Sequence, residues 1–206
     1  MNRDSAKKVA APRLRERLKE ATGEAIRVAA EEVLGERGLG ARMEDIAERA
    51  GVSVGTLYNH FRDREALVVE LMRVRRAQLL ERMDGVLAEV EGRPFGEQLR
   101  ALLERVFAHF VEHARFFTVV LQSEPPRGPS GTKANTLAEL TSRFDVVIQR
   151  GVAQGVVRRE GAEFHATLLL GMVRGLLWRA AEARREGELR RGADALLQVF
   201  LKGIEV

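Results

Sequence analysis

The chain has 206 residues, of which 45% are hydrophobic and 31% charged, which indicates a folded globular protein and excludes a disordered or fibrous one. Its length suits one small and one medium domain. The sequence has no cysteine, which excludes disulfides, thiolate zinc sites and cysteine nucleophiles. Alanine, leucine, glutamate and arginine dominate, so an all-α fold is predicted.

The formal net charge of +4 is unevenly distributed. Residues 1–19, the basic arm, contain seven lysine and arginine residues against Asp4 and Glu16, so the arm holds the whole positive excess. This distribution favours a polyanionic partner. No apolar segment approaches the ~18 residues of a membrane helix. The start of the chain also lacks the apolar region of a signal peptide. We therefore expect a cytoplasmic protein with no membrane partner.

Apolar residues at helical spacing predict about nine helices after the arm. The first is expected to end at Gly38 and the second at Gly51, because glycine suits the left-handed position that follows a helix. Ser53 is placed to cap a short third helix, and Asp63 to cap a fourth that runs to about residue 90.

The second half of the chain predicts five more helices. Gly92, Arg93 and Pro94 break the fourth helix, and a fifth continues to about residue 114. Residues 124–131 are rich in proline and glycine and predict an exposed loop. The remaining helices are expected over residues 116–122, 133–153, 164–178 and 189–204.

Residues 44–61 carry the strongest pattern in the chain, two short helices joined by a glycine-containing turn. Ala47 is small where the two helices cross, and Gly51 permits the sharp turn between them. Four apolar residues fill the space between the helices: Ile46, Val52, Leu57 and Phe61. The outer face of the third helix is left with small or polar residues that suit the major groove of DNA: Gly55, Thr56, Tyr58, Asn59 and His60.

Residues 50–61, Ala-Gly-Val-Ser-Val-Gly-Thr-Leu-Tyr-Asn-His-Phe, and the Arg-Asp-Arg-Glu-Ala-Leu that follows closely resemble the DNA-binding domain of the tetracycline-repressor family of bacterial transcription regulators. The resemblance covers roughly residues 20–70. It implies three units: the basic arm at 1–19, a three-helix DNA-binding domain at 20–66, and a helical ligand-binding and dimerisation domain at 67–206. The arm is then either a solvated tail or a segment that contacts the DNA backbone or minor groove.

The resemblance also implies roles for individual residues. The family commonly has threonine at the start of the second helix, where this chain has Arg42. Arginine can still reach a phosphate but cannot cap, so we expect a frayed helix start there. Phosphate contacts are expected from Arg42, Tyr58, His60 and Arg64, base contacts from Ser53, Gly55 and Asn59, and either kind from Thr56.

As a whole, the resemblance implies a homodimeric repressor that binds a palindromic operator in double-stranded DNA and is released by an apolar small molecule. A regulator without a ligand is the alternative, and no cofactor is expected. The aromatic residues of the second domain are either plain core or the lining of the ligand cavity. The candidates for that lining are Phe107, Phe110, Phe117, Phe144 and Trp178, with Gln122 as a polar contact.

Dimerisation is expected through the last two helices. Gly171 and Gly175 lie four residues apart and permit close helix approach. Two such helices from each subunit make a four-helix bundle. The alternative is an internal packing groove within a monomer. The residues expected in the interface are Leu168, Gly171, Gly175, Leu176, Leu197, Phe200 and Leu201.

One short sequence motif is typical of an enzyme. His109, Glu112 and His113 match the H-x-x-E-H signature of a zinc protease family, and the two histidines share one helix face. A helical metal-dependent enzyme is therefore the second interpretation of the chain. Three fixed residues are a weak signature, and the DNA-reading residues already account for the first third of the chain. We therefore expect no enzyme and no metal site, although a regulatory metal site stays open.

Overall fold

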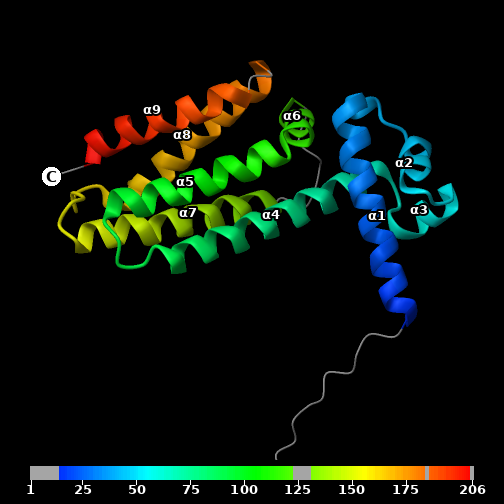
Figure 1. The fold of residues 1–206 in the computed structure, drawn as a ribbon, viewed down its shortest axis with the longest axis horizontal. Helices are drawn as coiled ribbons and strands as arrows, with labels where there is room; N and C mark the ends of the chain where they lie inside the picture. The colour runs from blue at the N-terminus through cyan, green and yellow to red at the C-terminus, as the bar shows by residue number, and fades with distance from the viewer. Residues whose placement is uncertain (1–13, 123–130, 184–185, 205–206) are drawn as a thin grey trace, which may run out of the picture.

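The computed structural model describes residues 14–122, 131–183 and 186–204. Within these ranges the chain forms nine α-helices and one short 3-10 helix at Gly38–Gly40, which confirms the predicted all-α fold (Figure 1). None of these helices combines the length and the apolar character that crossing a membrane requires. The helices are α1 (Leu14–Arg37), α2 (Met43–Ala50), α3 (Val54–His60), α4 (Arg64–Glu89), α5 (Phe95–Glu112), α6 (Ala114–Gln122), α7 (Gly131–Ala153), α8 (Ala162–Ala183) and α9 (Glu186–Ile204).

The predicted helix ends are confirmed where the sequence offers a cap or a glycine. Gly38 and Gly51 have φ values of 63° and 67°. Ser53 Oγ accepts a hydrogen bond from the Thr56 backbone N–H at 3.0 Å, which caps α3. Asp63 Oδ1 accepts one from the Ala66 N–H at 2.7 Å, which caps α4. These local bonds satisfy N–H groups that a helix end otherwise leaves without partners.

Two predicted boundaries differ in the structure. Helix α1 begins at Leu14, so its first residues belong to the predicted basic arm, whose other residues lie outside the described part. The predicted loop over 124–131 lies outside the described residues except for its last residue, Gly131, which begins α7.

The structure has two hydrophobic cores, and α4 contributes to both. The N-terminal core is formed by α1 to α3, with Leu67 and Leu71 from the first turns of α4. Met83 and Leu87, further along the same helix, pack in the second core with α5, α7, α8 and α9. Figure 1 shows α4 running from the α1–α3 unit to the larger bundle.

The N-terminal core also includes Phe116 of α6, which is fully buried there. Leu67, Leu71 and Phe116 lie beyond the division predicted at residue 66 and pack with the helix-turn-helix. Helix α6 packs on α1, so the N-terminal unit rests on two helices of the larger domain.

Candidate nucleic-acid interface

The turn between α2 and α3 sets the position of α3. Gly51 adopts the left-handed conformation that ends α2, and the Val52 N–H donates to the Ala47 carbonyl at 3.0 Å. Ala47 and Leu57 are buried between the two helices. The packing thus holds α3 by its inner face, and its opposite face remains in solvent.

The outer face of α3 presents the residues that were expected to contact DNA. Gly55, Asn59 and Tyr58 are exposed, and Tyr58 as a residue is 46% exposed. Thr56 is half-buried, and its hydroxyl lies 2.8 Å from Ser53 Oγ. Exposed hydrogen-bonding groups on one face of a short helix are what major-groove recognition requires.

His60 lies at the end of α3, half-buried against α1. Its ring would be 3.5 Å from a β-carbon placed on Gly23, so the glycine leaves room for the imidazole. This neighbour was not predicted, because Gly23 lies in a different helix and carries no local signal.

The expected fraying at the start of α2 is wrong. The Asp45 carboxylate accepts a hydrogen bond from the Arg42 backbone N–H at 3.2 Å and pairs with Arg37 at 2.7 Å. These bonds, that of Arg37 first, lower the pKa of Asp45. A negative charge in the first turn also suits the helix dipole. The Arg42 side chain is exposed, although its Nε lies 3.8 Å from the Asp45 carboxylate, with which it forms an ion pair.

Arg64 begins α4 beside the helix-turn-helix. Its Nη1 lies 3.4 Å from the Ala41 carbonyl oxygen, and its side chain is half-buried. Arg49 of α2 bonds to Glu32 and Glu36 of α1 at 3.1 and 2.9 Å, which fixes α2 on α1. This pair of bonds was not predicted from the sequence, since the partners are far apart in the chain.

The candidate ligand-lining residues fall into two groups. Phe107, Phe110 and Phe144 are buried in the second core, and Phe117 stacks on Phe110 with ring centroids 5.2 Å apart. Trp178 does not share this interior, because 47% of it is exposed on α8. Gln122 is the last residue of α6, and its side chain lies outside the described part.

The residues predicted for the dimer interface also fall into two groups, exposed and buried. Leu168 is 60% exposed, and Gly171 and Gly175 are exposed on the same side of α8. Leu197 and Phe200 were expected in the interface, but they are only 4% and 5% exposed because they pack in the core of their own chain. Leu176 and Leu201 are half-buried.

The structure adds two aromatic residues to the exposed side of α8. Phe164 is exposed and lies one helical turn before Leu168, and Trp178 lies one turn after Gly175. Apolar residues at this spacing lie on one helix face. We call Phe164, Leu168, Gly171, Gly175 and Trp178 the α8 stripe.

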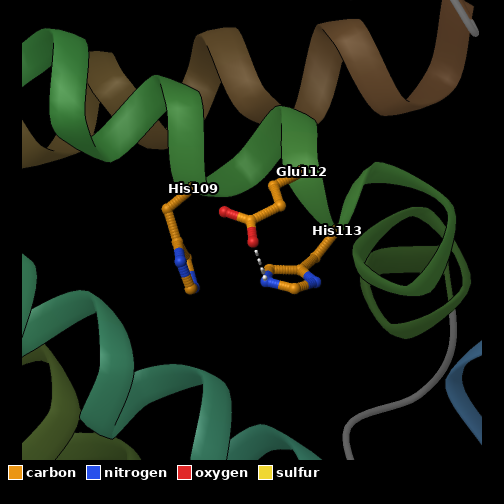
Figure 2. A group of neighbouring side chains, drawn as sticks. All are labelled: His109, Glu112 and His113. Atoms are coloured by element: carbon orange, nitrogen blue, oxygen red, sulfur yellow. Dashed lines mark ion pairs between the residues drawn. The ribbon is translucent and has the colours of Figure 1, made fainter. Parts of the chain in front are cut away.

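The three residues of the protease-like string do lie together at the end of α5. Their potential ligand atoms are within 4.8 Å of one another (Figure 2). Burial lowers the pKa of His109 to about 4, with additional lowering by His113 and Arg82. Arg82 donates to both carboxylate oxygens of Glu112 and thereby lowers the pKa of that group.

A short helix held with its polar face outward in a helix-turn-helix defines a DNA-binding protein. The comparisons with known proteins agree. Residues 26–71 match the model of bacterial regulatory proteins of the tetR family, and residues 92–178 match the tetracyclin repressor-like C-terminal domain. The chain belongs to the TetR family of bacterial transcriptional regulators. This membership decides against the enzyme interpretation.

The chain is also similar to individual proteins over most of its length. The HTH-type transcriptional repressor KstR2 of Mycobacterium tuberculosis is 28% identical over 170 residues, which cover 80% of this chain and 82% of that protein. FadR from Bacillus subtilis, solved in complex with stearoyl-CoA, has a TM-score of 0.71 and 20% identity over 88% of this chain and 98% of that one. The SmeT–triclosan complex has a TM-score of 0.72 and 22% identity over 90% and 92%.

Proposed function

We propose that the protein represses transcription as a homodimer on a palindromic operator and that an apolar small molecule releases it. The exposed face of α3, with Tyr58 and Asn59 outward, is the observation that carries the proposal. In this proposal Tyr58, His60, Arg64 and Arg42 contact phosphates. Ser53, Gly55 and Asn59 contact bases. The likeness to KstR2, which is named a repressor, supports the direction of regulation.

The α8 stripe supports the homodimer. Large apolar side chains at Phe164, Leu168 and Trp178 lie in water in the single chain, which is costly for so many on one face. Among the described residues, nothing lies within 4 Å of a β-carbon placed on Gly171 or Gly175. A second α8 could therefore approach closely, with Leu176 and Leu201 at the edge of the contact.

The second core supports an apolar ligand. Phe107, Phe110 and Phe144 are buried in this core, and Phe117 packs against it and stacks on Phe110, so α5, α6 and α7 supply large apolar side chains to it. Stearoyl-CoA and triclosan, which FadR and SmeT bind in their complexes, both carry a large apolar part. A ligand of this kind would separate Phe110 from Phe117, and Gln122 remains the proposed polar contact.

Helix α4 is the proposed link between ligand and DNA. Its first turns pack in the N-terminal core and its last turns in the core that contains the aromatic residues. A tilt of α4 would change the separation of the two α3 helices in a dimer. Half-sites of a palindrome lie about 34–36 Å apart, so a change of a few ångströms costs contacts on one half-site.

The operator can be identified with the purified protein alone, whichever gene it regulates. Selection of bound duplexes from a random pool should return an inverted repeat whose half-site centres lie about one helical turn apart. Recovery of single half-sites without symmetry would contradict the dimeric proposal. Recovery of no preferred sequence at all would contradict a specific operator.

The ligand is tested on that operator. Stearoyl-CoA is the probe, and coenzyme A without an acyl chain is its matched control. We expect the acyl compound to weaken operator binding by about 5- to 150-fold, the usual range of coupling between two sites, and the control to leave it unchanged. Triclosan tests whether the coenzyme portion is needed. Operator affinity that stays constant while stearoyl-CoA or triclosan binds measurably would contradict release by an apolar ligand.

A further inference from the structure

The end of α5 carries three side chains of the kinds that bind metals. His109 and Glu112 lie in its last turn, and His113 follows directly. Because these positions are three and four residues apart, the side chains point to one side of the helix. Figure 2 shows the Glu112 carboxylate between the two imidazole rings. The site lies where α5 meets α6, beside α4 and α1.

The hydrogen bond of His113 decides which of its two ring nitrogens has a lone pair available for a metal ion. Its Nδ1 lies 2.6 Å from Glu31 Oε1 of α1. A carboxylate only accepts, so Nδ1 carries the proton and the neutral ring keeps its lone pair on Nε2. That Nε2 is buried, has no hydrogen-bond partner among the described residues, and lies 3.7 Å from Glu112 Oε1. A histidine that donates to a carboxylate and turns its other nitrogen inward is the usual arrangement of a metal ligand.

The positive charge of Arg82, on α4, lies beside Glu112 and His109, so these two side chains stabilise a cation at this position. Arg82 donates to the Glu112 carboxylate, and its Nη1 lies 3.4 Å from His109 Nδ1. A guanidinium only donates, so His109 Nδ1 also presents a lone pair to this position. His109 itself is 2% exposed, which fixes its ring. The Arg82 side chain is about one-third exposed and can therefore leave into solvent.

We propose that His109, Glu112 and His113 bind one divalent transition-metal ion, with Arg82 displaced from Glu112. Two imidazole nitrogens and one carboxylate oxygen suit Zn²⁺ and Co²⁺ better than Mg²⁺ or Ca²⁺, which prefer oxygen ligands alone. Three protein ligands leave a fourth position for water or another small ligand. Glu31 is a positioning residue, because it acts on the metal only through His113.

The test uses the full chain without a polyhistidine tag, stripped with a chelator. Co²⁺ is the probe, because its visible absorption reports ligand geometry, and Zn²⁺ serves as its competitor. We expect one Co²⁺ per chain, displaced by Zn²⁺. Glu112→Gln should weaken Co²⁺ binding at least tenfold, and Glu104→Gln, an exposed change on the same helix, should leave it unchanged. Absence of Co²⁺ binding to the wild-type chain, or equal binding by Glu112→Gln, would overturn the proposal.

Two further variants separate ligation from general structure. Arg82→Gln removes the competing cation and should tighten Co²⁺ binding, whereas Arg105→Gln, exposed on α5, should not. Glu31→Gln should weaken binding by about 10- to 100-fold, with the visible spectrum of the bound Co²⁺ unchanged. Weaker binding by Arg82→Gln would show that Arg82 supports the site rather than competing for it, against the proposal. Unchanged affinity in Glu31→Gln would remove Glu31 from the site.

Discussion

Gly35 of α1 lies directly against Arg115 of α6. A β-carbon at Gly35 would be 2.9 Å from Cβ of Arg115, closer than such atoms pack. The contact joins the DNA-binding unit to the larger domain, because α1 belongs to the first and α6 follows α5 in the second. The absence of a side chain at residue 35 thus sets how closely the two units approach.

Gly35→Ala should destabilise the fold although alanine is the better helix former. The added methyl group must push on a Cβ atom, and overpacking of this kind costs about 1–3 kcal/mol, against a gain of about 1 kcal/mol in helix propensity. Gly85→Ala is the matched control, since Gly85 lies inside α4, four residues before its end at Glu89, with nothing described within 4 Å of the added carbon. The control should raise the free energy of unfolding by up to about 1 kcal/mol. Denaturant unfolding measures both, and a stabilised Gly35→Ala would contradict the close contact.

Arg64→Ala and Asn59→Ala should both weaken DNA binding, but with different dependence on DNA sequence and on salt. Loss of one phosphate contact weakens binding to all sequences and lowers the slope of log affinity against log salt by about one. Loss of a base contact costs about 1–3 kcal/mol on the operator and little on random DNA. Fluorescence anisotropy over a range of salt concentrations separates the two effects. Losses by Asn59→Ala of equal size on both DNA sequences would remove this residue from base recognition.

Leu168→Glu should convert the dimer to monomers. The substitution places a charge in the middle of the α8 stripe, where a buried unpaired carboxylate is strongly unfavourable. Val146→Glu, at an exposed apolar position on α7, is the control. Light scattering should give the 23.0 kDa chain mass for Leu168→Glu and twice that mass for the control and the wild type. A dimeric Leu168→Glu would place the interface elsewhere.

His165 should make stability depend on pH. Burial, and then Arg158, lower its pKa, and Glu163 opposes them only in part. The folded state therefore takes up the proton at a lower pH than the unfolded state, whose histidines titrate near ~6.5. Its contribution to stability is complete above that value and is lost as the pH falls below it. When the pH is lowered from 8 to 5.5, the thermal unfolding temperature of His165→Leu should fall less than that of the wild type. Equal losses would assign the pH dependence to other groups.

Local chemistry explains what could be predicted from the sequence. The caps at Ser53 and Asp63 and the turn at Gly51 act on neighbouring backbone groups, so a short window of residues contains the whole signal. The position of the exposed α3 face followed from the same window. The bond that Asp45 accepts at the start of α2 is also local, but it was not predicted, since a carboxylate in the first turn can equally well stay in solvent.

Contacts between distant segments could not be predicted in this way. Helices α8 and α9 both have apolar residues on more than one face, and periodicity alone does not say which face another helix of the same chain covers. Leu197 and Phe200 were therefore assigned to the dimer contact, although they fill the core, and Trp178 was assigned to the interior. The bond between Glu31 and His113 likewise joins residues whose neighbours in sequence give no hint of each other.

The continuity of α4 has a consequence for how this segment can vary in length. Leu71 is buried in one core and Met83 in the other, with an unbroken helix between them. One residue inserted between these positions would turn the second buried face by about 100° and displace it by about 1.5 Å relative to the first. Insertions and deletions here should therefore abolish folding or regulation, even where substitutions at the same exposed positions are harmless.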